Sequence, residues 1–298
     1  MRGQAAIVGI GELPTERRIN GRSTNSLLSQ AARLAIADAG LRKEDIDGII
    51  TRGSDVGPMD LAEYMGLSLT FCEGNTQHGS AGAHSVAMAA AAIHAGLATT
   101  IMCLFGGTRD PNEGGFGPGI TRGPAPANKL TEFEAPFGPA AGAGTGYGMM
   151  KHRHMYEFGT TQEQFAKMAV NQRFNALTNP NAVFKGEPIT VDDVLNSRMV
   201  NDPLHLLECV MPCAGAAACI VTSAERANSL PNPPVYILGA ATGVSDHDTI
   251  WQAERITTTP VAISARKAYE MAGYGPREWC INRRTGQAGC LAGRNLPS

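Results

Sequence analysis

The sequence contains no apolar run long enough to cross a membrane and no cluster of basic residues. Its longest apolar stretch, residues 86–97, is interrupted by His94, whereas a bilayer-spanning helix needs about 20 residues. The formal net charge is only -2, so electrostatics gives no reason to propose a nucleic acid or an anionic membrane as a partner. The apolar part of residues 1–14 is too short for a signal sequence, and a cytoplasmic location is therefore predicted.

The sequence also lacks the cysteine pattern of a disulfide framework or a zinc site. Seven cysteines, an odd number in a large charged chain, indicate free thiols in a reducing compartment. Cys209, Cys213 and Cys219 form the only cluster. Their first pair has a spacing that can begin a zinc site, but no second pair of ligands follows at a finger-like distance. We therefore predict no metal.

Hydrophobic residues make up 43% of the sequence and charged residues 17%, which is sufficient for a large buried core. Short apolar runs alternate with helical patterns, and this alternation predicts an α/β sheet with helices on its faces. The predicted strands are residues 5–11, 46–51, 67–71, 99–107, 214–223 and 235–243. The first of them has the composition of a buried parallel strand.

The clearest helix signals flank these strands. Residues 24–40 offer a capping residue at Ser23, Thr24 or Asn25 and a glycine stop at Gly40. A glycine- and proline-rich stretch, residues 106–148, then interrupts the pattern. Because loops of this length usually serve a site or an interface, we interpret it as the start of an excursion from the sheet. Further helices are predicted between 150 and 205, one of them capped by Thr160 or Thr161.

Two distant segments share a pattern. "AARLAIADAG" at 31–40 and "SARKAYEMAG" at 264–273 match at five positions, and each follows an apolar run that ends in glycine. This similarity predicts two related halves. We divide the chain into a first half (1–107 and 214–230), an inserted loop domain (108–213) and the start of a second half (231–298). The second half is predicted to be truncated, because hydrophobic periodicity ends after Pro276.

The turn within "EGNTQHGSAGAHSVAMAAAAIHAG", residues 73–96, is the candidate site. His78, Gly79 and Ser80 stand where a strand-to-helix turn would present a nucleophile. Ser80 would need a paired base to attack a thioester, and His78 is too near in sequence to face it. Capping of the helix by Ser80 is therefore favoured over catalysis.

Several phrases, taken in order, resemble one family. "HMYEFGTT", "ITVDDVLNSRMVNDPLHLLEC" and "AAACIVTSAERA", together with the turn, resemble the thiolase-like proteins over residues 5–276, in particular the branch of acetyl-CoA acetyltransferases and lipid-transfer-protein thiolases. The resemblance implies a layered α/β fold with duplicated halves. It also implies a coenzyme A thioester as substrate or ligand, no bound cofactor, and a homodimer or a heteromer formed along strand 99–107.

The resemblance fails at the catalytic groups. Family members with thiolase activity carry Asn-x-x-Cys-x-Ser-Gly at the turn, and overlaying the helix places Gly79 at the cysteine position, followed by Ser80 and Gly82. These three residues are the predicted thioester-binding positions, while Ser80 and His78 are the only side chains left as catalytic candidates. The second-half histidine and cysteine of the family have no counterpart here, and Ala214 replaces a frequent Asp. Classical thiolytic activity is therefore not expected.

Two further functions remain open. The resemblance includes proteins that cleave β-hydroxyacyl-CoA by a retro-aldol step with a small OB-fold partner, although their base resembles a second-half tyrosine that this chain lacks. The second open function is that of a non-catalytic scaffold or an acyl-CoA-binding subunit. A dinucleotide site at "GIGELP", residues 9–14, is disfavoured, since only the first two glycines of that fingerprint are present.

Overall fold

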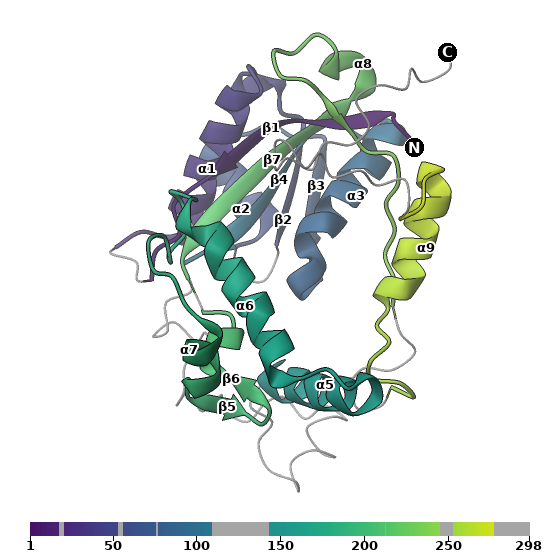
Figure 1. The fold of residues 1–298 in the computed structure, drawn as a ribbon. Coiled ribbons are helices and arrows are strands. Elements are labelled where there is room, and N and C mark those ends of the chain that lie inside the picture. Colours follow the sequence, from purple (N-terminus) through teal and green to yellow (C-terminus); the bar gives the residue numbers. More distant parts are fainter. Residues whose placement is uncertain are drawn as a thin grey trace, which may run out of the picture.

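A six-stranded mixed sheet forms the centre of the chain in the computed structural model, which describes residues 1–17, 21–52, 56–75, 77–108, 143–211, 213–244 and 253–276. The strand order is β3-β2-β4-β7-β1-β8 (Figure 1). The strands are β1 (Ala5–Glu12), β2 (Gly48–Arg52), β3 (Phe71–Asn75), β4 (Thr100–Gly107), β7 (Gly215–Ser223) and β8 (Val235–Tyr236). Strands β3, β2 and β4 are parallel, whereas β7 is antiparallel to both β4 and β1. The prediction of a parallel first strand is thus wrong, because both neighbours of β1 run against it.

Helix α1 (Thr24–Asp38) covers one face of the sheet. The Ser23 hydroxyl accepts a hydrogen bond from the Ser26 N–H, and Gly40 follows the helix with a φ of 66°, as the capping pattern predicts. The helix lies very close to β1, since a Cβ on Gly9 would be 2.5 Å from the Ala35 carbonyl oxygen. Glycine is required here because any side chain would displace the helix.

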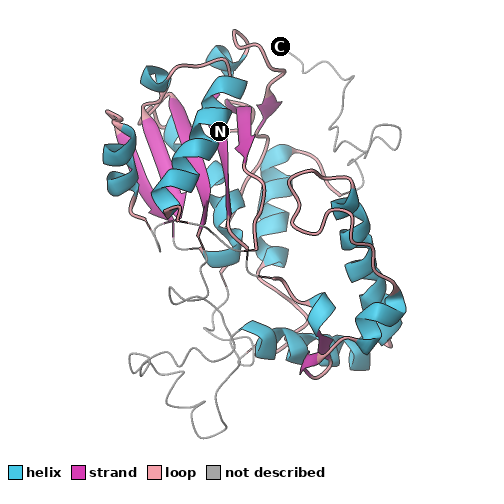
Figure 2. Ribbon diagram, turned by 90° about the vertical axis from the view of Figure 1, so that its left-hand side faces the viewer, coloured by secondary structure: helices cyan, strands magenta, loops and turns pink. Residues whose placement is uncertain are grey.

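Helix α3 (Ala81–His94) packs against the opposite face of the sheet (Figure 2). Ala89, Ala90 and Ala92 are buried, and their small side chains allow a close approach to β4. The helix is buried on this side only, because Ala83 and His94 are exposed. The alanine-rich pattern predicts a helix that lies centrally between two layers, and in the part of the chain that the structure describes a sheet covers only one of its sides.

Two strand predictions need correction. The third strand is β3 at residues 71–75, not 67–71, because β3 is an edge strand whose exposed Cys72 and Glu73 give no apolar signal. Strand β4, which we expected at a dimer edge, lies inside the sheet between β2 and β7. The available edge is β3.

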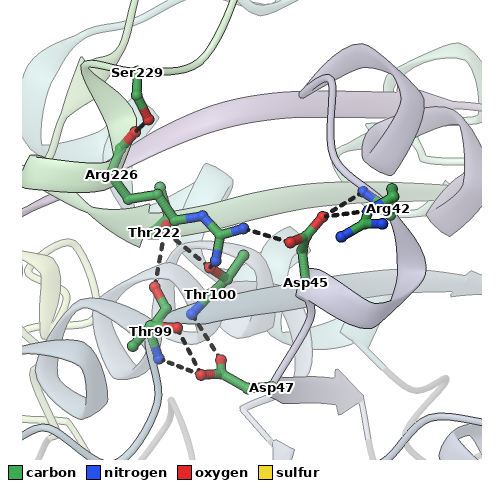
Figure 3. A network of polar contacts seen from close by, with 8 residues as sticks. All are labelled: Arg42, Asp45, Asp47, Thr99, Thr100, Thr222, Arg226 and Ser229. Atoms are coloured by element: carbon green, nitrogen blue, oxygen red, sulfur yellow. Dashed lines mark hydrogen bonds and ion pairs between the residues drawn. The ribbon is translucent and has the colours of Figure 1, made fainter.

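Polar side chains join the strands at the end of the sheet where β2 and β4 begin (Figure 3). The Asp47 carboxylate accepts hydrogen bonds from the Thr99 N–H and hydroxyl and from the Thr100 N–H, at 2.7 to 2.8 Å. Arg226 donates to Asp45 at 2.8 Å and to the Thr100 hydroxyl at 3.1 Å. These contacts fix β2, β4 and β7 relative to one another.

The segment between β4 and β7 is largely helical. Its elements are α5 (Ala143–Phe158), α6 (Gln162–Leu177), α7 (Val191–Asn196), β5 (Met199–Asn201), β6 (Leu204–His205) and the 3-10 turn η4 (Leu206–Glu208). Thr161 caps α6 as predicted. Most of the predicted loop 106–148 lies outside the described residues, although α5 begins within it.

The remaining elements are α2 (Pro58–Met65), α8 (Ala224–Ala227), α9 (Val261–Ala272) and the 3-10 turns η1 (Lys43–Asp45) and η2 (His78–Ser80). Only two residues of the predicted strand 235–243 form β8. In the described part of the chain, no helix has the length and apolar character needed to span a bilayer. The cytoplasmic location and the three-part division stay predictions.

Candidate functional site

The candidate site lies at the carboxyl end of β3. Strand β1 runs parallel to β4, because each is antiparallel to the intervening β7. The carboxyl ends of β1, β2, β3 and β4 therefore all lie at the same end of the sheet. In open α/β sheets, ligands bind beyond the carboxyl ends of parallel strands. The turn that joins β3 to α3 lies at this end of the sheet.

Asn75 holds this turn in place. It is the last residue of β3, and its side chain is only 4% exposed. The amide Nδ2 donates to the Ala81 carbonyl at 2.8 Å and to the Ser85 hydroxyl at 2.9 Å, while Oδ1 accepts from the Gln77 N–H at 2.8 Å. One buried amide therefore ties the strand end to the first turns of α3. We did not single out Asn75 from the sequence, although the family pattern begins with an asparagine.

Ser80 does not have the predicted capping contact. It stands at the N-cap of α3, but its hydroxyl donates to the Gln77 carbonyl at 2.9 Å and accepts no hydrogen bond from the helix. The side chain is exposed, and the carbonyl oxygen that accepts its hydrogen bond is no base. The geometry thus supports neither capping nor activation of Ser80 as a nucleophile.

Gly79 and Gly82 differ from the packed glycines of the sheet. Among the described residues, no atom lies within 4 Å of a Cβ built on either one. By contrast, a Cβ on Gly48 would be 2.7 Å from the Ile101 side chain. Packing of the described residues therefore does not require glycine at 79 or 82.

Two ways of counting along the sequence place different residues, His78 or Gly79, at the nucleophile position of the family. Counting from the alanines of α3 places Gly79 there, whereas counting from Asn75 places His78 there. Both residues belong to η2, directly before α3, and the His78 side chain lies outside what the structure describes. Neither count restores a cysteine.

The first turn of α3 favours negative charge. It contains no acidic residue, and a helix N-terminus carries about half a positive charge together with unpaired N–H groups. A thioester oxygen that gains negative charge is stabilised by such a site.

A buried cluster of charged side chains lies in the segment between β4 and β7. Lys151 Nζ is 2.6 Å from Glu208 Oε1 and donates to the Pro203 carbonyl at 2.8 Å, and it lies 5.0 Å from the centroid of the Phe165 ring. The His205 N–H donates to the other Glu208 oxygen at 2.8 Å. Because the charges of Lys151 and Glu208 neutralise each other, this cluster is a structural ion pair.

The cysteine cluster is divided between elements. Cys219 is in β7, while Cys209 follows η4 and its thiol contacts the His205 carbonyl at 3.4 Å. Within the described ranges, no three histidine, cysteine or acidic side chains are placed to share a metal ion.

Comparison with known proteins supplies the context for this turn. No protein-family profile matches the chain. A steroid side-chain-cleaving aldolase of Thermomonospora curvata is 35% identical over 292 residues, which is 93% of this chain and 72% of the relative. A 17-hydroxy-3-oxo-4-pregnene-20-carboxyl-CoA lyase of Mycobacterium tuberculosis is 37% identical over 82% of this chain and 64% of the relative. An acetyl-CoA acetyltransferase of Methanothermobacter thermautotrophicus is 32% identical over 85% of this chain and 66% of the relative.

The chain belongs to the thiolase-like family. A solved structure, the Ltp2-ChsH2(DUF35) aldolase, superposes with a TM-score of 0.82 at 34% identity, covering 93% of this chain and 72% of that one. The layered α/β fold implied by the resemblance is confirmed. The chain spans about two thirds of the length of the thiolase-like relatives named above.

Proposed function

We propose that this thiolase-like chain is part of a lyase that cleaves a β-hydroxyacyl-CoA by a retro-aldol reaction. One observation carries the proposal: the turn before α3 keeps an open helix N-terminus but has Gly79, not cysteine, at its end. Thiolysis needs a thiolate that carries the acyl group, whereas a retro-aldol step forms no acyl-enzyme. Two relatives with 35% and 37% identity are an aldolase and a lyase, which supports this choice over acyl transfer.

The reaction breaks one carbon–carbon bond. A base removes the proton of the β-hydroxyl, the Cα–Cβ bond cleaves, and its electron pair moves into the thioester to form an enolate. The β-carbon leaves as a ketone or aldehyde, and a proton added at Cα gives a shorter acyl-CoA. The chemistry requires an oxyanion site and a base.

We assign the oxyanion role to the turn at residues 79–82. Gly79 and Gly82 leave room for the thioester, and the α3 terminus stabilises the enolate oxygen. Ser80 and His78 are the side chains at the turn, but Ser80 lacks the contacts of a base. We therefore place the base at a group other than Ser80. The acyl-CoA is the substrate, and the chain binds no further cofactor in this scheme.

The two sides of the sheet differ in their openness to a partner. Strand β1 pairs with the outermost strand β8 only at residues 6 and 7. Farther along β1, the Ile10 N–H donates to the Asp38 carboxylate at 2.9 Å, and the Val8 carbonyl accepts from the Asn232 amide at 3.3 Å. These contacts occupy backbone groups that another strand would need. On β3, Cys72 and Glu73 are exposed. We propose that β3 is the edge for a homodimer, and that a small OB-fold protein completes a heteromer, as the ChsH2(DUF35) complex suggests.

The proposal is tested with the full chain, alone and mixed with the ChsH2(DUF35) protein. The probe is 17-hydroxy-3-oxo-4-pregnene-20-carboxyl-CoA, the compound named for one relative. We expect release of a ketone and a shorter acyl-CoA from the mixture, and no cleavage of acetoacetyl-CoA by free CoA. Binding of the probe without cleavage in both samples would favour a scaffold. Thiolytic turnover that Ser80→Ala abolishes would overturn the proposal and make Ser80 the nucleophile.

A further inference from the structure

Two cysteines face each other across the centre of the sheet. Strands β4 and β7 are antiparallel, and Cys103 is directly opposite Cys219 in their register. Directly opposite residues of an antiparallel pair have Cα atoms about 4.5–5.5 Å apart and point to the same face. A disulfide needs Cα atoms about 4.4–6.8 Å apart. The Cα separation of this register pair therefore falls within the range in which a disulfide forms.

The two thiols lie on one face of the ladder and are within hydrogen-bond reach of each other. Cys103 and Cys219 pack in one cluster on the face covered by α3. Cys103 is fully buried and Cys219 is half-buried, so an oxidant reaches Cys219 first.

The thiols influence each other's proton affinity. A hydrogen bond from the Cys103 thiol to the Cys219 sulfur lowers the pKa of Cys219, although burial opposes this. The same hydrogen bond, together with burial, raises the pKa of Cys103 well above its ordinary value. Cys219 is therefore the thiol that attacks as a thiolate, and Cys103 is the resolving thiol.

We propose that Cys103 and Cys219 form a dithiol modification site that a small disulfide, such as oxidised glutathione, converts to an intramolecular disulfide. The Cys219 thiolate attacks one sulfur of the oxidant, forms a mixed disulfide and releases one glutathione thiolate. Cys103 then loses its proton, attacks the Cys219 sulfur and releases the second glutathione. Two protein thiols are oxidised and one glutathione disulfide is reduced, so electrons balance.

Neither Cys72 nor Cys209 faces a second cysteine across a strand pair. Cys72 is an exposed residue of β3. Partial burial of its sulfur, together with the neighbouring Glu73, raises the pKa of its thiol. Its register partner on β2 is Ile49. Burial and Glu208 raise the pKa of Cys209. These two thiols serve as internal references for the chemistry of the pair.

The test oxidises the folded, unsubstituted chain with oxidised glutathione. The reaction is stopped with acid, remaining thiols are alkylated in denaturant, and peptides are mapped by mass spectrometry without reduction. We expect a Cys103–Cys219 linked peptide, lighter by two hydrogens than the sum of its parts, to account for most of the internal disulfide. Recovery of both cysteines in alkylated form, or a linkage of either to another cysteine, would overturn the proposal.

Matched variants identify the attacking thiol. Cys103→Ser should stop at a stable glutathione adduct on Cys219, whereas Cys219→Ser should leave Cys103 reduced. Cys72→Ser should not change the yield of the linked peptide. A glutathione adduct on Cys103 in the Cys219→Ser chain would contradict the assigned order of attack. Because the primary measurement uses the unsubstituted chain, failure of a variant to fold does not remove the test.

Discussion

The first and second halves of the chain each place a glycine against the backbone of the following helix. Gly9 meets Ala35 and Ala39 of α1, and Gly239 meets Ala268 and Ala272 of α9. These alanines are the pairs matched in the sequence comparison, and each helix ends in a left-handed glycine, with φ of 66° at position 40 and 68° at position 273. The duplicated pattern therefore corresponds to a repeated contact.

The two contacts differ in what surrounds them. Helix α1 buries six residues against the sheet, whereas none of the residues of α9 is buried. Figure 1 shows α1 on the sheet and α9 away from it. Among the described residues, the glycine–helix contact at α9 therefore has no buried core around it, whereas the one at α1 does.

The largest difference is expected from matched glycine substitutions. Gly9→Val would force a side chain into Ala35 and Ala39 of a buried helix and should lower the free energy of unfolding by about 3 kcal/mol. Gly239→Val creates a similar collision against a helix that has no buried residues among those described, so its cost should stay below about 1 kcal/mol. Urea unfolding of both variants measures this. Equal losses would show that α9 is part of the core and would break the comparison.

An intermediate effect is expected from the ion pairs that anchor each half. Arg226 donates to Asp45 at 2.8 Å and to Thr100, and Arg226→Met should cost about 1.5 kcal/mol. Arg255, which is 62% exposed and 3.6 Å from Glu157, is the second-half counterpart, and Arg255→Met should cost about 0.3 kcal/mol. Thermal unfolding distinguishes these values, and a larger loss from Arg255→Met would reverse the ranking.

The Arg226 effect should depend on pH. The Arg42 N–H and the Arg226 guanidinium lower the pKa of Asp45 below its ordinary value of 3.8. A lowered folded-state pKa gives stabilisation that is fully present above the unfolded pKa and is lost as pH falls through the folded value. The gap between the unsubstituted chain and Arg226→Met should therefore be constant near pH 7 and shrink below pH 3.8. A gap that widens in acid would contradict this role of Asp45.

The smallest stability effect is expected at the N-terminus of α3. This helix also contacts the second half, where His84 lies 3.0 Å from the Thr242 hydroxyl. Gly79→Cys should change the free energy of unfolding by less than about 0.5 kcal/mol, because no described atom lies near the new Cβ. The helix terminus should lower the pKa of the introduced thiol by about 1 unit, so it should react with iodoacetamide faster than Cys72. Stopped-time alkylation at pH 7 measures both rates. A slower introduced thiol would show that the helix end does not favour an anion.

Apolar patterns predicted much of the first half. The runs at β1, β2, β4 and β7 and the caps of α1 and α6 all lie where we expected them, because buried strands and capped helices leave local signals. The pattern misplaced β3, whose side chains are partly exposed, and overextended β8. The location of the turn at residues 78–82 was also predicted, but the amide of Asn75 that holds it was not.

By itself, the sequence determined the order of strands and helices, the repeated pattern of a strand, a glycine and a helix, and the absence of a cysteine from the turn before α3. Tertiary structure alone decided that β7 lies between β4 and β1, that β3 is the edge, and that Cys103 meets Cys219. The physical reason is range. Hydrophobic periodicity and capping act over a few residues, whereas strand order and register arise from pairing between segments that are more than a hundred residues apart, as in the Thr100–Thr222 contact with its sequence separation of 122.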